Sequence, residues 1–571
     1  MIKKINKVFL KSKILPIILL FLWAAVFTKI SEFVINGSTS YDMRFHLARI
    51  VGLAQSINNG DILPNINNIF SWGTGYASNM FYGNWQLYIP ALVFIRTQNI
   101  LLSFSVFAFT VILLESLSTY YFIGKIVKDK CKSFWLAIMI PCFFPLYSFG
   151  MTMVVGLVPV LLYALYKVLY EDKTSPILLA VTVALLIQSH ILSTLILAII
   201  SIVFLIFNLD KIKPKHIASF IMSVFIGLFL SSGFIIQYVE QVHSQGFYFD
   251  WKNRDFPVST DKMFILNKNF NSGFSPITNF FDLPLKLLAL YYALNFVKLK
   301  RVSKTLLCVV FIMYFAMTSL LPWDILKNTF LGIIQYTERL SFFSAILLLI
   351  IFGVENEVKV VRSIAIGIAV MYFFGVVKND VNTPNKEMTD FMAYNLTTMN
   401  QAYTNPLSTF VSPVGDEYYT LDIHHADVRN RNFVDVSQKN NIVVNSVKYG
   451  YNKIEVDYKV MDSNTMGSIV VPRIYYKGYV AHYSNGSKGS QPMLQKVEKT
   501  ESELKDDQTK GMPKETERVL NNGKIYLTLE GKGRVLVKYK KTIAQKIGYG
   551  IESISWIAII FLTILRKNNT V

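Results

Sequence analysis

The chain has 571 residues, of which 52% are hydrophobic and only 16% are charged. Soluble domains carry about 25% charged residues, so the long apolar runs in the first two thirds of this chain indicate a polytopic membrane protein and not a soluble one. The formal net charge of +20 does not indicate a nucleic-acid partner, because many of the lysines gather in short loops between apolar runs, which is the positive-inside pattern.

The apolar runs predict about twelve membrane-spanning helices, beginning with an uncleaved signal anchor that follows the basic N-terminus. With the N-terminus in the cytoplasm, this count places the lysine-rich short loops on the cytoplasmic side. We therefore expect a multi-pass protein of a bacterial cell membrane that contacts membrane lipids. The expected spans are 14–34, 99–123, 133–150, 153–170, 175–189, 191–208, 217–239, 283–297, 305–321, 339–353, 363–377 and 548–565.

The first long outer loop, 35–98, opens with three ionisable residues at helical spacing. Asp42, His46 and Arg49 occupy positions i, i+4 and i+7, which fall on one face of an α-helix. Ionisable groups at membrane depth are costly and tend to mark functional sites, so this face is a candidate active site. The alternative is a surface helix with a local ion pair.

The remainder of this loop is rich in Trp, Tyr, Gly and Asn. Trp72, Tyr82 and Trp85 are candidate substrate-binding residues, because aromatic rings stack on sugar rings. The alternative is that these rings anchor the loop at the membrane interface, as aromatic belts do.

Two further outward-facing clusters lie much later in the chain. His190 follows a mid-chain span, and Gln335, Glu338 and Arg339 precede or open a late one. Arginine binds phosphate through charge-assisted hydrogen bonds, and histidine can do the same, so these residues are candidate contacts for a phosphorylated lipid carrier. Alternatively, His190 caps a helix hairpin and Arg339 extends to lipid headgroups.

The chain changes character between 378 and 546. Alternating apolar and polar residues, broken by Asn-Gly and Gly turns, predict an antiparallel β-sandwich. The highly charged insert 498–517 is typical of a solvated loop or a short exposed helix. We therefore expect a transmembrane domain (1–377), an extracytoplasmic β-rich domain (378–546), and a last span with a short cytoplasmic tail (547–571).

Several common chemistries have no counterpart in the sequence. It contains no P-loop, no glycine-rich dinucleotide motif, no nucleophile elbow and no Cys/His zinc spacing. None of the three cysteines falls in the polar region after residue 380, so no disulfide framework holds that region. The sequence therefore disfavours an ATPase, a serine hydrolase and a zinc peptidase, and it demands no cofactor and no metal.

The order of the motifs resembles a known family. One span is followed by D-x-x-x-H-x-x-R in a long outer loop, then by W-G-x-G and F-Y-G, by S-H-I-L-S after a mid-chain span, by Q-x-x-x-R at a late span, and by V-P-R-I-Y-Y-K-G-Y before one last span. This order resembles the YfhO-like bacterial membrane proteins of the GT-C glycosyltransferase superfamily, and the likeness covers most of the chain. One departure is FGMTMVVGLVP, which carries no charge where related chains often have an Arg/Glu pair.

The resemblance implies a GT-C-like transmembrane fold and an enzyme that uses a polyprenyl-phosphate sugar as donor on the outer face of the membrane. It also implies that Asp42 is the catalytic base of the first outer loop, and that Arg49, His190 and Arg339 bind phosphate. A second acid that is often found in such loops would map onto Asp61.

We therefore expect an inverting glycosyltransferase in which Asp42 deprotonates a hydroxyl of a cell-wall or glycolipid acceptor and polyprenyl phosphate leaves. A lipid or polysaccharide transporter is the alternative, although transporters more often show charges within spans and two similar halves. A third possibility is a non-catalytic scaffold for envelope assembly. The expected substrate-binding residues are His46, Arg49, Trp72, Tyr82, Trp85, His190, Gln335, Glu338 and Arg339.

Overall fold

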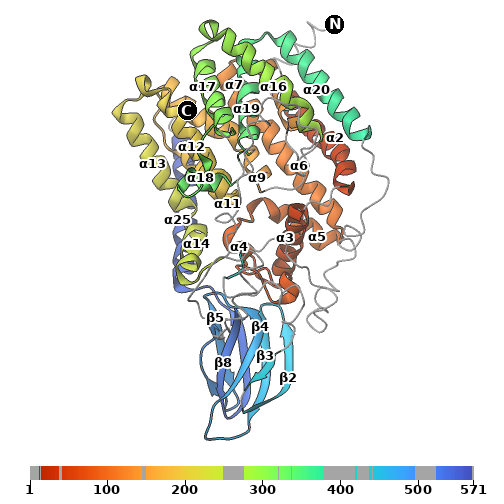
Figure 1. The fold of residues 1–571 in the computed structure, drawn as a ribbon, viewed down its shortest axis with the longest axis vertical. Coiled ribbons are helices and arrows are strands. Elements are labelled where there is room, and N and C mark those ends of the chain that lie inside the picture. The colour runs from red at the N-terminus through yellow and green to blue at the C-terminus, as the bar shows by residue number, and fades with distance from the viewer. Residues whose placement is uncertain are drawn as a thin grey trace.

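The computed structural model contains a helical body, a β-sandwich at one end of it, and a layer of short helices and loops between the two (Figure 1). The structure describes residues 12, 14–37, 41–143, 150–247, 276–318, 320–335, 337, 339–378, 418–420, 436–439, 441–494 and 523–568. The charged insert 498–517 lies outside these residues.

The chain is mostly helical, and each apolar run of the sequence overlaps one or more helices. In the first half these are α2 (Leu15–Gly37), α3 (Tyr41–Asn58), α4 (Ser78–Phe81), α5 (Tyr88–Thr97), α6 (Ile100–Ser118), α7 (Gly124–Val127), α8 (Lys130–Met139), α9 (Thr152–Val155), α10 (Val158–Tyr170), α11 (Ile177–Ser189), α12 (Ile191–Ile206), α13 (Pro214–Leu230) and α14 (Ser232–Ser244). In the second half they are α16 (Pro276–Leu294), α17 (Arg301–Ala316), α18 (Trp323–Leu326), α19 (Arg339–Glu355), α20 (Val358–Lys378) and α25 (Ile543–Asn568).

Local sequence determines where several helices begin. The side chain of Asn99 accepts the backbone N–H of Leu102 at 3.0 Å and caps α6. Asp129 accepts the N–H of Cys131 at 2.8 Å and caps α8. Such caps satisfy backbone donors that have no partner within the helix.

The number of membrane spans differs from the expected twelve. Within the described residues, the stretches Ile100–Val127, Thr152–Tyr170 and Ile543–Leu565 are long and apolar enough to cross a membrane, and the pair α13 and α14, bent by 75°, makes a fourth if it counts as one span. Several of the other apolar helices are short: α11 has 13 residues and α12 has 16. At 1.5 Å per residue they reach about 20 and 24 Å, against a hydrocarbon core of about 30 Å. Sequence apolarity therefore overestimated the number of full-length spans.

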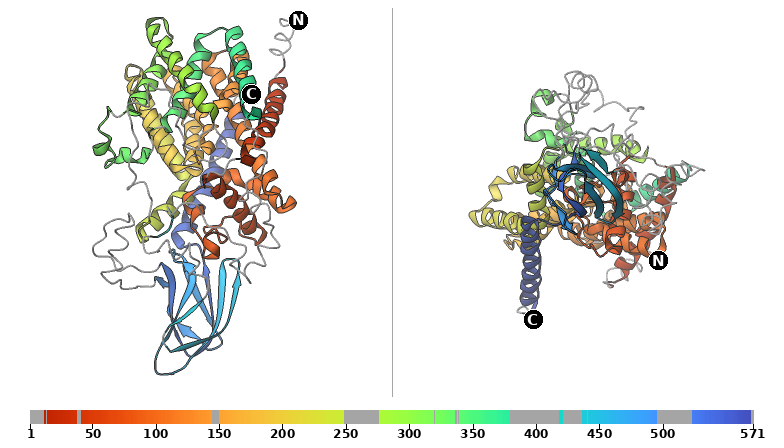
Figure 2. Two further views of the ribbon diagram at one scale, coloured as in Figure 1. Left: turned by 45° about the vertical axis from the view of Figure 1, so that its right-hand side comes forward. Right: turned by 90° about the horizontal axis from the view of Figure 1, so that it is seen from below.

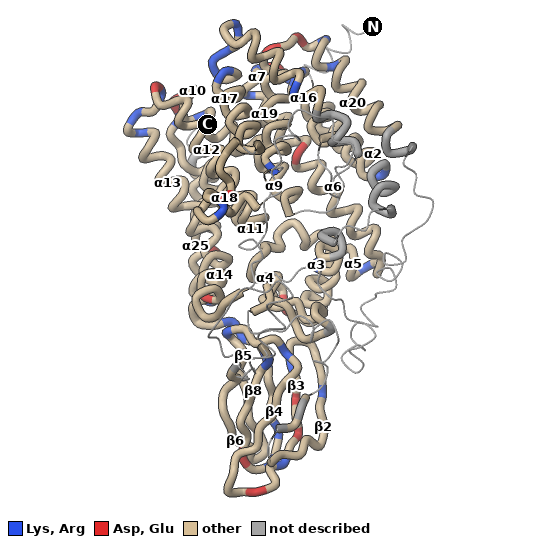
Figure 3. The backbone as a smooth tube through the Cα atoms, viewed as in Figure 1, with Lys and Arg blue, Asp and Glu red and all other residues tan. Residues whose placement is uncertain are grey.

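Charge is distributed unevenly along the helical body. Many Lys and Arg residues lie at the end farthest from the β-sandwich (Figure 3). From the sandwich, α25 runs back along α14 and α13 toward this end (Figure 2). The first-loop helices α3, α4 and α5 lie at the opposite end of the body, next to the sandwich (Figure 1).

The β-rich part forms two antiparallel sheets that pack face to face. One sheet has the order β1-β4-β8-β6, with β7 also paired to β8, and the other has the order β2-β3-β9-β5. Alternate residues of β3 and β8 are buried, and the Tyr458 phenol on β3 donates to the carbonyl of Glu530 on β8 at 3.1 Å. The two sheets agree with the period-2 pattern of the sequence. The strands are β1 (Ser437–Lys439), β2 (Ile442–Gly450), β3 (Lys453–Val460), β4 (Gly467–Ile474), β5 (Tyr479–Ser484), β6 (Lys488–Gly489), β7 (Met493–Leu494), β8 (Lys524–Glu530) and β9 (Lys532–Tyr539).

The motif V-P-R-I-Y-Y-K-G-Y attaches the sandwich to the helical part. The Tyr476 phenol donates to the carbonyl of Tyr418 at 3.0 Å, and the side-chain amide of Gln241 on α14 donates to the carbonyl of Lys477 at 2.8 Å. Tyr476 is fully buried. The motif therefore fixes the position of the sandwich against α14.

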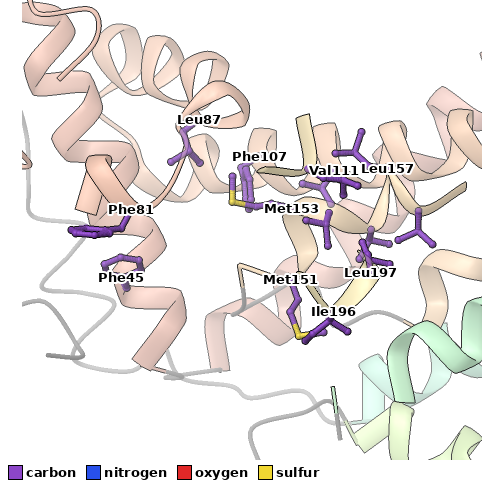
Figure 4. Close-up of a cluster of buried hydrophobic side chains, with 14 of the residues drawn as sticks. Phe45, Phe81, Leu87, Phe107, Val111, Met151, Met153, Leu157, Ile196 and Leu197 are labelled. Atoms are coloured by element: carbon purple, nitrogen blue, oxygen red, sulfur yellow. The ribbon is translucent and has the colours of Figure 1, made fainter. Parts of the chain in front are cut away.

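An apolar core lies beneath the first-loop helices. Figure 4 shows the Met153 side chain next to Phe107, and Met151 next to Ile196. All four side chains are buried. The sulfur of Met153 also lies 4.0 Å from a terminal nitrogen of Arg49, so this core directly contacts the polar residues of α3.

Candidate functional site

Arg49 on α3 is fully buried, with an exposed fraction of 0%. Its Nη2 donates to the carbonyl of Gly83 at 2.8 Å and to Asn84 Oδ1 at 3.1 Å. Its Nε has no hydrogen-bond partner, and no carboxylate pairs with the guanidinium, among the residues that the structure describes. Burial lowers the pKa of Arg49 to about 10, so the group is still a cation at neutral pH. Burying a cation that has no counter-ion among the described residues is costly, so a negatively charged group next to Arg49 would stabilise this position.

His46 lies one turn before Arg49 and is also buried. Arg49 Nη1 lies 3.3 Å from His46 Nδ1. Because a guanidinium can only donate, Nδ1 accepts and the imidazole proton is on Nε2. Burial, with the positive charge of Arg49, lowers the pKa of His46 well below its usual value, so the imidazole is neutral and presents an N–H donor.

Tyr82 joins α3 to the turn between α11 and α12. Its ring stacks on His190, with centroids 5.4 Å apart and planes at 26°, and contacts His46 edge-on at 6.0 Å. The guanidinium carbon of Arg49 lies 4.8 Å from the centre of the same ring, within range for a cation–π interaction. Tyr82 therefore brings together two of the predicted residues from α3 and one from the middle of the chain.

His190 lies in the turn between α11 and α12, outside both helices. Its Nδ1 accepts the backbone N–H of Ser193 at 3.3 Å and lies 2.7 Å from the Ser193 hydroxyl, so His190 is the N-cap of α12. Burial, together with the charges of Arg339 and Arg49, lowers the pKa of His190 to about 3. His190 therefore caps α12 and also lies in the predicted site. Capping uses only Nδ1, so Nε2 is not needed for the cap.

Arg339 is the first residue of α19 and is half-buried. Its Nη1 donates to the side-chain oxygen of Gln335 at 2.8 Å. The backbone of Gln335 has φ 56°, a conformation that costs a non-glycine residue roughly 1–3 kcal/mol and that recurs at functional sites. Gln335 therefore holds the guanidinium of Arg339 from a strained position.

The cluster of Arg49, His46, Tyr82, His190 and Arg339 has the features of an anion-binding site. It combines two guanidinium groups with two imidazoles that are neutral at pH 7. In addition, α12 begins directly after His190 and α19 begins at Arg339, and helix N-termini carry partial positive charge and unpaired N–H groups. These donors suit the oxygens of a phosphate group.

Three of the predicted site residues have side chains outside the described part of the chain. Asp42 lies in the first turn of α3, and its backbone is on the face that carries His46 and Arg49. Seven residues at 1.5 Å each put it about 10 Å from Arg49 along the helix axis. The side chains of Trp72 and Glu338 are likewise outside the described residues.

Trp85 and Gln188 lie close to the site but use their polar groups elsewhere. The indole N–H of Trp85 donates to the hydroxyl of Ser189 at 2.9 Å, which joins the first outer loop to the end of α11. The amide of Gln188 donates to Glu552 on α25 at 2.9 Å. Trp85 was predicted to bind substrate, but in the structure its indole N–H holds the loop before α5 against the end of α11.

Two glycines allow the loops to approach closely at the site. A Cβ on Gly83 would overlap the carbonyl oxygen of Gln188, and a Cβ on Gly150 would lie 2.9 Å from His190 Nε2 and 2.9 Å from the Tyr82 ring. Neither glycine was identified from the sequence as a site residue, although Gly83 belongs to the F-Y-G motif that was noted there. No sequence pattern predicts that the backbone carbonyl of Gly83 accepts a hydrogen bond from Arg49.

The aromatic neighbour Tyr418 was also not identified from the sequence. Its ring stacks on Phe81, with centroids 4.7 Å apart and planes at 6°, and lies 5.8 Å from Tyr82. Its backbone N–H donates to the phenol of Tyr76 at 3.1 Å. It therefore links the first outer loop to the part of the chain that carries the sandwich.

A narrow apolar cavity of about 20 Å³ lies between α10, α12, α17 and α19. Its lining includes Leu197, two turns after His190 on α12, and Phe343, one turn after Arg339 on α19. Each of these two helices thus has a polar residue at its start and an apolar wall further along.

Comparison with known proteins identifies no relative, since no family model and no curated protein matches this chain. Functional interpretation therefore depends on the geometry of the cluster and on the motifs of the sequence.

The close approach at Gly83 yields a stability prediction. Gly83→Ala should lower the free energy of unfolding by about 3 kcal/mol, because the added methyl group overlaps a backbone carbonyl that cannot move without displacing the end of α11. Denaturant unfolding of the purified protein in detergent measures this change. Gly550→Ala is the matched control, since a Cβ at Gly550 meets no atom within 4 Å. Equal stability of the two variants would contradict the packing described here.

The burial of His190 yields a pH prediction. The unfolded chain protonates this histidine near pH 6.5, whereas the folded chain does so near pH 3, so the contribution of His190 to stability falls as the pH falls between these values. At pH 5 the loss relative to pH 7 is about 2 kcal/mol. His190→Asn keeps a capping oxygen but cannot gain a proton, so its melting temperature should fall less on acidification. The exposed His243→Asn is the control, and identical pH profiles for wild type and His190→Asn would contradict the prediction.

Proposed function

We propose that this chain is an inverting glycosyltransferase of GT-C-like architecture that takes its sugar from a polyprenyl-phosphate donor. The observation that carries this proposal is the buried guanidinium of Arg49, whose Nε lacks a partner within the described residues and which lies next to His46, Tyr82 and His190. A phosphate group would neutralise this buried charge and satisfy the remaining donor.

The helix starts suit the phosphate head of the donor, because His190 and Arg339 lie there. The cavity between α10, α12, α17 and α19 has only about 20 Å³, room for about one water molecule, so it does not hold the isoprenoid chain. That chain would instead lie against exposed apolar side chains of α12, such as Leu195 and Ile202, which are available to an amphiphilic donor in the membrane.

In the proposed reaction, Asp42 accepts the proton of an acceptor hydroxyl. The hydroxyl oxygen forms a bond to the anomeric carbon from the face opposite the phosphate, and the bond between the anomeric carbon and the phosphate oxygen breaks. The electron pair leaves with polyprenyl phosphate, and the anomeric configuration is inverted. Arg49 and Arg339 stabilise the negative charge on the departing phosphate.

The expected orientation has support from the charge distribution. Many Lys and Arg residues lie at the end of the helical body farthest from the sandwich (Figure 3), whereas α3, which carries His46 and Arg49, lies next to the sandwich (Figure 1). If the basic end is cytoplasmic, the site faces the outside of a bacterial cell membrane. A cell-wall glycan or a glycolipid would then be the acceptor.

The activity prediction uses two variants. Purified protein with a panel of polyprenyl-phosphate sugars and an extract of envelope glycans and glycolipids should release polyprenyl phosphate and form a glycoside. Asp42→Asn should lower turnover about a hundredfold, because the base is removed. Arg339→Lys should lower it about tenfold, because a bidentate donor becomes a point charge.

Matched controls separate these effects from general damage. Asp324→Asn changes a fully exposed carboxylate, and Arg301→Lys changes an exposed arginine that pairs with Asp210; both should retain wild-type turnover. Full activity of Asp42→Asn would refute the assignment of the base. Movement of intact lipid across a vesicle membrane without glycosyl transfer would favour a transporter.

The orientation is tested by labelling with a membrane-impermeant maleimide. The three native cysteines are buried or partly buried. Asn464→Cys, in an exposed turn of the sandwich, should be labelled in intact cells, whereas Lys213→Cys, in a basic loop, should be labelled only after lysis. The reverse pattern would place the sandwich in the cytoplasm and would refute an outer active site.

A further inference from the structure

A polar cavity lies between the first outer loop and the β-sandwich, apart from the cationic cluster. Its volume is about 210 Å³, whereas one water molecule needs roughly 10–15 Å³ by the same measure. The cavity therefore has room for a small polar molecule. It is lined by one isoleucine and by Asp61, Asn65, Asn68, Asn452, Tyr539 and Lys541.

Both sides of this cavity are needed to form it. Asp61, Asn65 and Asn68 follow α3 in the first outer loop, whereas Asn452 lies in the turn between β2 and β3, and Lys541 follows β9. The Tyr451 phenol of the sandwich donates to Asp61 Oδ2 at 3.0 Å. The cavity is therefore a product of the way in which the sandwich packs on the loop.

One polar atom of the lining lacks a partner. Asn68 is 2% exposed, and its side-chain oxygen has no hydrogen bond within the described residues. A buried acceptor without a partner is costly, and Asn68 lines this cavity. A hydroxyl group in the cavity is the kind of donor that this side chain lacks.

The charges of the lining define the class of ligand. Lys541 Nζ lies 3.9 Å from Asp61 Oδ1, so the two charges largely cancel. The ammonium group disfavours a metal cation, and the carboxylate disfavours a phosphate. A neutral molecule with several hydroxyl groups fits best, because hydroxyls donate to the carboxylate and amide oxygens and accept from the amide and ammonium groups.

We propose that this cavity binds one sugar residue of a glycan. The cavity would recognise the glycan at a place separate from the anion site, since none of its lining residues belongs to the cluster around Arg49. The inference does not depend on transferase chemistry, because binding is measured without any donor lipid. A failed binding test and a failed activity test can therefore be told apart.

The test is saturation-transfer NMR on the full-length protein in detergent, with the methyl glycosides of glucose, galactose, mannose and N-acetylglucosamine as probes and glucose 1-phosphate for comparison. Wild type should show transfer to at least one of them. Asp61→Asn should weaken that binding about tenfold, because a charge-assisted hydrogen bond is lost. Asn68→Leu should abolish it, because the side chain then offers no acceptor.

Controls are the exposed Asp324→Asn and the exposed Asn58→Leu, both of which should bind like wild type. Size-exclusion profiles and melting curves check folding, and the near-isosteric Asp61→Asn decides the result if Asn68→Leu does not fold. No binding of any glycoside to wild type would overturn the proposal and leave a cavity that holds water only. Unchanged binding in Asp61→Asn would also overturn it, as would binding that requires the phosphate of glucose 1-phosphate.

Discussion

The buried guanidinium of Arg49 is the constraint on which the sandwich end of the helical body depends. A guanidinium has five donors and no acceptor, so its burial requires oxygen atoms at fixed positions. The carbonyl of Gly83 and the side chain of Asn84 supply two of them. This requirement holds the loop after Tyr82 against α3, and that loop in turn packs against the end of α11.

The aromatic rings of the first outer loop connect this site to the sandwich. Phe81 stacks on Tyr418, and the carbonyl of Tyr418 accepts the phenol of Tyr476. Because Tyr82 directly follows Phe81, a shift of the sandwich would reach the ring that lies between Arg49 and His190. The sandwich and the anion site are thus connected by a continuous series of side-chain contacts.

A second connection runs through the last helix. Glu552 on α25 accepts the amide of Gln188 and the backbone N–H of Gly233, and α25 begins four residues after β9 ends. Glu552 therefore ties the residues before His190 to the bend between α13 and α14. In the proposed function, these contacts would keep the phosphate site and the glycan cavity at a fixed separation.

Sequence periodicity by itself determined the local structure of this protein. The spacing of His46 and Arg49 placed them on one helix face, period-2 alternation located the strands, and the apolar runs located helices outside the segment 35–98, because these patterns depend only on near neighbours in the chain. The number of full-length spans did not follow, since apolar composition does not show where a helix is bent, as at Ser231 between α13 and α14.

Only the tertiary structure decided which distant residues meet. His190 lies against Tyr82 and near Arg49 because glycines at 83 and 150 allow close packing of the loops, and no local pattern encodes that contact. Tyr82 and Trp85 are three residues apart in one loop, yet Trp85 binds Ser189 whereas Tyr82 lies within the cationic cluster. The cavity beside Asp61 exists only where the sandwich packs on the loop. Such pairings depend on the shape of both partners, and a linear sequence of residue types does not contain that shape explicitly.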